Sequence, residues 1–314
     1  MKYFIFDMDE TIAHLYSVFY FIASIKIKEL SNEVILSRIL ENKLKIAYKV
    51  FVNKITKEEN SDLPLGIIRP GIIDIMYNLK ELQSKGIINK VAIYSNNSHL
   101  ESLQLIRDII HTSIGSDSLI GDCIHWNHPL RDEERFLHEG ATNKTWPILK
   151  NILINGPCGA PNTIQPTDVY FFDDLRHEKM FETLYFQVPP YTTKASFNRI
   201  RDIYIDALIA ANLTNNEKQE FYTVVSNILL GINQPYNTLN TIILSFLRRT
   251  KCTIGPYVKL TKESDNGIMI MKSVIDILSL RSGVKDLKVE EGGYKKTRRA
   301  RHRKFNKSKR IKKQ

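Results

Sequence analysis

The chain has 314 residues, and its composition, 43% hydrophobic and 25% charged, is ordinary for a soluble globular protein. The formal net charge is +11, but the last twenty residues carry twelve Lys or Arg and no acid, which leaves −1 for the rest. The three scattered cysteines exclude a disulfide framework, and the apolar run 15–25 is about half as long as a bilayer requires. No signal peptide is expected ahead of the first strand. The expected location is therefore intracellular, in the cytoplasm or the nucleus, without membrane contact.

The first predicted element is a short buried strand, residues 3–6, which ends in acidic residues. Its aromatic and β-branched side chains favour a strand, and Asp7 and Asp9 follow it directly. Two carboxylates at a strand end repel each other and lose solvation unless a cation lies between them. Mg²⁺ prefers hard oxygen ligands, and open α/β sheets bind ligands at the carboxyl ends of their strands. The motif therefore predicts a magnesium site.

Residues 15–60 are predicted to be helical. Apolar residues recur at helical spacing from Leu30 to Leu44, and Ser31 is the predicted start of that helix. One role open for this segment is to pack on the sheet as a layer.

Arg69-Pro70-Gly71 then precedes a predicted helix from Ile72 to Lys85, which Gly86 stops. We expect Arg69 to serve the structure or the electrostatics of the rim of the site.

A second buried strand, residues 91–94, ends at Ser95 and Asn96. The side chain of Asn96 could stabilise a tight turn after this strand.

Residues 111–143 contain a cluster of possible metal ligands, with Cys123, His125 and His128 close together. Zinc sites usually take paired ligands from two separate places, and no matching second pair follows. We therefore interpret residues 111–143 as a surface loop near the site.

Residues 142–154 are predicted to form a helix that opens at Lys144. Lys144 is the candidate site lysine, and Lys150 is the alternative candidate for the same role. A third buried strand, residues 169–172, ends in Asp173 and Asp174, and a further strand is expected at residues 185–188. A second pair of acidic groups is thus expected at the carboxyl edge of the sheet.

After residue 195 the sequence pattern becomes helical. Helical patterns run over residues 197–211, 215–230, 237–249 and 268–280, and Thr214-Asn215-Asn216-Glu217 has the form of a capping box. We predict a helical extension over residues 196–285. The basic tail, residues 286–314, is expected to be disordered, and it could be a nuclear-import signal, an arm on nucleic acid or a contact for acidic protein segments.

Taken in order, these motifs resemble those of the haloacid-dehalogenase-like (HAD) superfamily of phosphohydrolases. The string 6–11, Phe-Asp-Met-Asp-Glu-Thr, is similar to the first motif, Ser95 to the second, Lys144 to the third and Asp173-Asp174 to the fourth. The longer form 7–14 and Arg69-Pro70-Gly71 resemble the branch of RNA polymerase II C-terminal-domain phosphatases and NLI-interacting-factor-like proteins. The second motif departs from that branch, because Asn96 and Asn97 follow where a small residue is usual.

The resemblance implies an α/β fold with a Rossmann-like doubly wound parallel sheet in a core of residues 1–195. In that superfamily a helical cap or flap over the site is inserted between the first two motifs, so residues of about 15–64 would form it; the alternative is that they only pack on the sheet. It also implies a role for each motif residue. Asp7 would attack phosphorus and form an aspartyl-phosphate, and Asp9 would protonate the leaving oxygen and later activate water. Ser95 and Lys144 would bind the phosphoryl oxygens. Asn96 could also donate to a phosphate oxygen or only stabilise a tight turn, and neither role is favoured over the other. The Mg²⁺ ligands would be Asp7, the backbone carbonyl of Asp9, and Asp173 or Asp174.

Three functions remain open. The first is a magnesium-dependent phosphatase acting on phosphoserine or phosphothreonine in a phosphoprotein. The second is a phosphatase of nucleotides or nucleic-acid ends, which Asn96 and the basic tail favour. The third is a non-catalytic nucleic-acid-binding protein that retains the fold. The tail would contact nucleic acid or the import machinery in any of the three.

Overall fold

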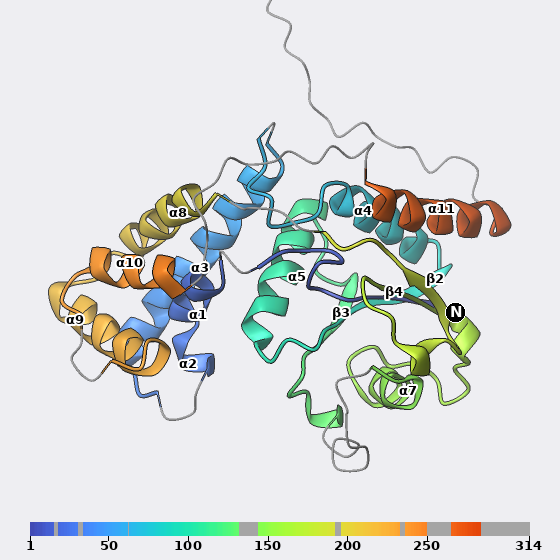
Figure 1. The fold of residues 1–314 in the computed structure, drawn as a ribbon, viewed down its shortest axis with the longest axis horizontal. Coiled ribbons are helices and arrows are strands. Elements are labelled where there is room, and N and C mark those ends of the chain that lie inside the picture. The colour runs from blue at the N-terminus through green and yellow to red at the C-terminus, as the bar shows by residue number, and fades with distance from the viewer. Residues whose placement is uncertain are drawn as a thin grey trace, which may run out of the picture.

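The computed structural model describes residues 1–15, 18–30, 34–61, 63–131, 144–191, 196–232, 236–249 and 265–283. It is an α/β protein with a five-stranded, all-parallel sheet flanked by helices (Figure 1). The strands lie in the order β3-β2-β1-β4-β5. Their bounds are Lys2–Phe6 for β1, Ile88–Tyr94 for β2, Ile120–Ile124 for β3, Val169–Asp173 for β4 and Leu184–Gln187 for β5.

Strand β1 lies at the centre of the sheet, between β2 and β4. Phe6 is in register with Ile93 of β2 on one side and with Phe172 of β4 on the other. The chain extends outward from β1 through β2 to β3, then returns to the other side of β1 for β4 and β5, so the strand order reverses at β1. Open α/β sheets bind ligands beside such a reversal, at the carboxyl ends of the strands.

Side chains of the strands alternate between two apolar layers, as the two-residue period of a strand requires. Phe4 and Phe6 of β1 face the layer under α4 (Ile72–Ser84) and α5 (Leu100–Ile114), whereas Tyr3 and Ile5 face α7 (Trp146–Asn155). The helices therefore cover both faces of the sheet (Figure 1), as the predicted doubly wound architecture requires.

A second group of helices stands beside the sheet, packed against α5, and combines two distant parts of the chain (Figure 1). The segment between β1 and α4 contributes α1 (Phe19–Ile25), α2 (Ile27–Leu30) and α3 (Arg38–Glu59). The segment after β5 contributes α8 (Phe197–Ala210), α9 (Asn215–Val224), the π-helical turn Val225–Leu229 and α10 (Leu239–Arg249). Phe21 packs against Phe197, Tyr204 and Phe246, and Lys43 pairs with Glu217. We call this group the helical unit.

The last described helix, α11 (Asn266–Arg281), packs on α4 of the sheet layer instead. Its N-cap residue Asp265 forms a buried ion pair with Arg69, in which Nε of Arg69 lies 2.7 Å from Oδ2 of Asp265. The helices expected to form one extension thus lie against two different parts of the molecule. The structural role expected for Arg69 is confirmed.

Several predicted elements differ in detail from the structure. Helix α3 begins at Arg38, and Ser37 caps it by accepting a hydrogen bond from the Leu40 amide, so the start predicted at Ser31 is wrong. The loop predicted over residues 111–143 is wrong at two places, because residues 111–114 end α5 and residues 120–124 form β3. Lys144 precedes α7, whose N-cap is Thr145.

Other predictions agree with the structure or lie outside it. The Thr214 capping box is present, and Gly86 adopts the left-handed conformation (φ 69°) just after α4, where a side chain would be strained. The predicted tail and residues 132–143 of the predicted loop lie outside the described residues. Within the described ranges, no helix is both long enough and apolar enough to cross a membrane.

Candidate active site

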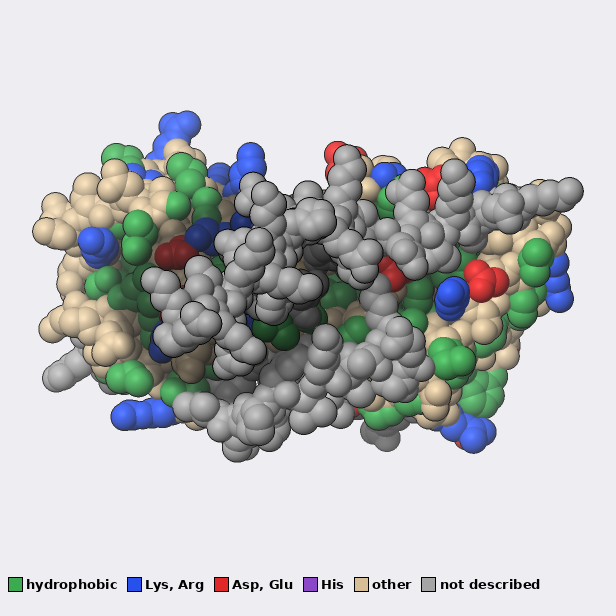
Figure 2. Space-filling model, turned by 90° about the horizontal axis from the view of Figure 1, so that it is seen from above, with side chains coloured by type: hydrophobic (Ala, Val, Ile, Leu, Met, Phe, Trp, Pro, Cys, Tyr) green, Lys and Arg blue, Asp and Glu red, His purple; other side chains and the backbone are tan. Residues whose placement is uncertain are grey.

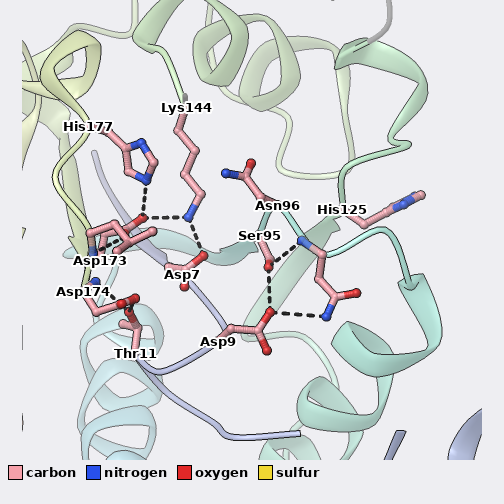
Figure 3. Close-up of polar contacts among 12 residues, drawn as sticks. Asp7, Asp9, Thr11, Ser95, Asn96, His125, Lys144, Asp173, Asp174 and His177 are labelled. Atoms are coloured by element: carbon pink, nitrogen blue, oxygen red, sulfur yellow. Dashed lines mark hydrogen bonds and ion pairs between the residues drawn. The ribbon is translucent and has the colours of Figure 1, made fainter. Parts of the chain in front are cut away.

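The site lies at the carboxyl ends of the three central strands, where functional side chains from distant parts of the sequence meet (Figure 3). Asp7 follows β1, and its amide donates to the Phe172 carbonyl of β4 (2.8 Å). Ser95 follows β2, and its amide donates to the Ile124 carbonyl of β3 (2.9 Å). Asp173 is the last residue of β4. The parallel register therefore fixes the side-by-side placement that the sequence predicts.

Lys144 enters the site from the segment just before α7 and is buried between two carboxylates. Its Nζ donates to Oδ1 of Asp7 and lies 2.6 Å from Oδ2 of Asp173. Burial by itself would lower the pKa of Lys144, but the charges of Asp7 and Asp173 raise it above its usual value. The lysine thus remains a cation and cannot be a solvated residue at a helix start.

The carboxylates of the site differ in how easily they ionise. Burial, together with the charges of Asp173 and Asp9, raises the pKa of Asp7 well above its usual value, and Lys144 only partly offsets this. Burial would also raise the pKa of Asp173, but the neighbouring His177 and Lys144 hold it below the usual value. Ionised Asp7 is therefore a poorly solvated anion, which a nearby cation would stabilise.

Asp7, Asp173 and Asp174 each offer a carboxylate oxygen, and these oxygens lie within 4.8 Å of one another. This is the one group of potential metal ligands found among the described residues, and it does not include Cys123, His125 or His128. Three carboxylates beside the Lys144 ammonium carry two negative charges in excess when all are ionised. A divalent cation would neutralise this excess, and hard oxygen donors suit such an ion. The donor set therefore fits a metal ion.

Thr11 holds Asp174 in this group. Its hydroxyl lies 3.1 Å from Oδ1 of Asp174 and accepts from the Asp174 amide at 2.9 Å. Thr11 thus joins the loop that follows β1 to the loop that follows β4.

The side chain of Asp9 is directed toward the loop after β2 rather than toward the acidic group (Figure 3). Asn97 donates from Nδ2 to Oδ2 of Asp9 (3.2 Å), and the Ser95 hydroxyl lies 3.5 Å from the same oxygen. Burial raises the pKa of Asp9, while these hydrogen bonds lower it. Asp9 is therefore positioned apart from Asp7, on the side of Ser95.

Three residues of the site were not found from the sequence. Asn97 holds Asp9, and its Oδ1 also accepts from the His99 amide at the start of α5 (2.8 Å). His177 is buried, with Nε2 3.4 Å from Oδ2 of Asp173. Arg131 is buried beneath the Ser95–Asn96 loop. A polar residue next to a motif could have indicated Asn97, but no local pattern singles out His177 or Arg131.

The sequence also indicated Asn96 and Lys150 as candidate site residues, and only Asn96 lies at the site. Asn96 points toward the Lys144 side of the site (Figure 3), and its side-chain oxygen accepts a hydrogen bond from Arg131 (2.8 Å). Lys150 lies in the middle of α7, and no contact joins it to the site carboxylates among the described residues.

The helical unit reaches the rim of the site through one aromatic contact. The ring of Phe19 in α1 lies 4.4 Å from that of His99, which follows the Ser95–Asn97 loop. The insertion thus contacts the same loop that positions Asp9.

Comparisons with protein-family models, with curated proteins and with solved structures found no match to this chain.

Proposed function

We propose that the protein is a magnesium-dependent phosphohydrolase of the HAD-like type, working through an aspartyl-phosphate on Asp7. The observation that carries the proposal is the meeting of Asp7, Ser95, Lys144 and Asp173 at three adjoining strand ends. A buried carboxylate beside a cation and a hydroxyl donor is suited to attack an anionic phosphoryl group, provided that charge repulsion is neutralised.

In the first step, a carboxylate oxygen of Asp7 attacks phosphorus, and the bond to the leaving oxygen breaks. Lys144 already binds Oδ1 of Asp7, so Oδ2 is the oxygen left for the attack. The Lys144 ammonium and the Ser95 hydroxyl stabilise the charge that develops on the phosphoryl oxygens.

Asp9 supplies the proton that the leaving oxygen needs. Burial raises its pKa, which favours the protonated form required of a general acid. In the second step, Asp9 accepts a proton from the water that attacks the aspartyl-phosphate, and Asp7 is regenerated with release of inorganic phosphate. Asn97 holds Asp9 in place for both transfers.

Asp7, Asp173 and Asp174 would hold Mg²⁺, with the Asp9 carbonyl as a further ligand implied by the resemblance. When bound, the ion supplies positive charge that reduces repulsion between the Asp7 carboxylate and the substrate phosphate. His177 and Lys144 keep Asp173 ionised, so that it is ready to act as a ligand.

The substrate that we favour is phosphoserine or phosphothreonine in a protein, with the helical unit acting as a cap beside the site. The support is the resemblance of string 7–14 and of Arg69-Pro70-Gly71 to the polymerase C-terminal-domain phosphatase branch. Contact between Phe19 and His99 places the helical unit at the rim, where a cap would act.

A second candidate is a phosphatase of nucleic-acid ends, and the charge of the helical unit favours it. The described residues of 18–61 and 196–249 carry thirteen Lys or Arg against eight acids. Figure 2 shows Lys and Arg side chains on the exposed surface of this unit, at the left. Lys45, Lys49 and Lys57 lie exposed along α3. Such a surface attracts the phosphate backbone of nucleic acids.

The test is turnover of a generic aryl phosphate with and without Mg²⁺ by the wild type and by Asp7→Asn. We expect magnesium-dependent turnover that falls by several decades in Asp7→Asn, because the nucleophile is lost. Asp168→Asn is the matched control, since Asp168 lies at the other end of β4, paired with Lys2. Equal activity of Asp7→Asn and wild type would refute the proposal and leave the non-catalytic, nucleic-acid-binding alternative.

A substrate panel separates the two catalytic candidates. Phosphoserine peptides, nucleotides and oligonucleotides with 3′-phosphate ends are compared at equal concentration. Turnover of the oligonucleotide ends without turnover of the peptides would overturn the protein-phosphatase assignment.

A further inference from the structure

Arg131 is a buried arginine that the proposed reaction does not use. It ends the short 3-10 helix Pro129–Arg131, and its side chain is only 3% exposed. A buried guanidinium loses its hydration, so its hydrogen bonds and ring contacts must compensate. Where those contacts go therefore indicates what the residue holds in place.

Three hydrogen bonds join Arg131 to the loops at the carboxyl ends of β2 and β3. Nη1 donates to the carbonyl of Ser95 (2.9 Å) and to that of His125 (3.2 Å), while Nη2 donates to Oδ1 of Asn96 (2.8 Å). The guanidinium also lies over the rings of Tyr94 (4.9 Å) and Trp126 (5.1 Å). Arg131 is thus held between two aromatic rings and bonded to both residues of the Ser95–Asn96 pair.

The bond to Asn96 fixes which way its amide faces. A guanidinium is only a donor, so the Asn96 group next to Nη2 must be the carbonyl oxygen. The amide nitrogen, which is a donor, is then turned the other way, toward Lys144 (Figure 3). Asn96 therefore presents a hydrogen-bond donor on the side where Asp7 and Lys144 lie.

We propose that Arg131 is a positioning residue that orients the Asn96 amide as a third donor to the bound phosphoryl group, beside Ser95 and Lys144. The inference rests on the proposed function, because it assumes that phosphate binds at this site. It also decides between the two roles open for Asn96 in favour of phosphate binding.

The size of the effect follows from the strength of hydrogen bonds to charged groups. Loss of one such bond weakens binding by about ten- to a hundredfold. Arg131→Lys keeps the positive charge, but a single ammonium cannot reproduce the fork that serves the Ser95 carbonyl and Asn96 together. We expect Arg131→Lys to weaken phosphate binding by about tenfold, and Asn96→Ala by about the same factor.

The experiment measures the affinity for inorganic phosphate by calorimetry in the presence of Mg²⁺, together with KM and kcat for an aryl phosphate. The variants are Arg131→Lys, Asn96→Ala and the double variant. Arg107→Met is the control, since Arg107 pairs with Asp108 on α5, away from the loop. If Asn96 acts through Arg131, the double variant binds phosphate about as weakly as either single variant. Fully additive losses, or wild-type affinity in Arg131→Lys, would overturn the inference.

Asn96→Asp keeps the inference testable if the Arg131 variants do not fold. The substituted side chain retains the acceptor for Arg131 but replaces the amide donor with an oxygen that repels phosphate, so phosphate affinity should fall while thermal stability is kept. Unchanged affinity would refute the assignment. If the wild type binds phosphate but turns over no phosphate ester, the proposed function fails while the positioning of Asn96 stands.

Discussion

Nζ of Lys144 lies 2.6 Å from Oδ2 of Asp173, and both side chains are almost completely buried. The ammonium also binds Asp7, so one cation joins two strand ends that would otherwise repel each other. Breaking a buried ion pair leaves an uncompensated charge, which costs more than the pair itself contributes.

Lys144→Met should therefore lower both activity and stability. We expect the free energy of unfolding to fall by about 3 to 5 kcal/mol without Mg²⁺, and by less with Mg²⁺, because the ion restores positive charge near Asp7 and Asp173. Urea unfolding in both buffers measures this. Lys150→Met on α7 is the control, and a loss of the same size in Lys150→Met would contradict the special role of Lys144.

Asn97→Ala should impair the proton transfer that we assign to Asp9. Removing the donor releases the Asp9 side chain, and this loss of positioning outweighs the further rise of its pKa, which by itself would favour the protonated acid. A phosphoserine peptide needs a protonated leaving oxygen, whereas an aryl phosphate has a good leaving group, so kcat should fall about tenfold or more for the peptide and less for the aryl phosphate. Equal losses on both substrates would argue against this role.

Gly267→Ala should destabilise the docking of α11 on α4. A Cβ at this position would lie 2.2 Å from Nη2 of Arg69, so the buried Arg69–Asp265 pair would have to shift. We expect a loss of about 2 kcal/mol or more in chemical unfolding. Ser273→Ala, on the exposed side of the same helix, controls for helix propensity. Wild-type stability of Gly267→Ala would show that the ion pair is not closely packed there.

Glu59 should make stability depend on pH. Burial raises its pKa from 4.5 to about 7, although backbone hydrogen bonds, including one from the Ile67 amide, partly lower it. The folded state then binds more protons than the unfolded state between these two values, so stability falls as pH rises from 4.5 to about 7 and is level above that.

The expected fall is of the order of 1 kcal/mol, because the side chain is partly exposed and solvent screens it. Glu59→Gln should remove this part of the pH dependence, as measured by urea unfolding between pH 5 and 8. Glu58→Gln, which alters the neighbouring carboxylate paired with Arg199, should leave it in place. An unchanged slope in Glu59→Gln would contradict the assignment.

Much of the site could be predicted from the sequence because its residues directly follow buried strands. The apolar runs at 3–6, 91–94 and 169–172 indicate strands by composition alone, and parallel strands bring their carboxyl ends to one edge. Strand β3 could not be predicted in this way, since Gly121 and Asp122 interrupt its apolar pattern.

What the sequence determined by itself was therefore the α/β class and the side-by-side placement of Asp7, Ser95 and Asp173. Only the tertiary structure decided that Lys144 is buried between two carboxylates, that Arg131 holds Asn96, and that segments 18–61 and 196–249 form one helical unit. The physical reason is distance along the sequence. Strand patterns are encoded by neighbouring residues, whereas a buried cation is placed by packing between parts of the chain that are far apart in sequence.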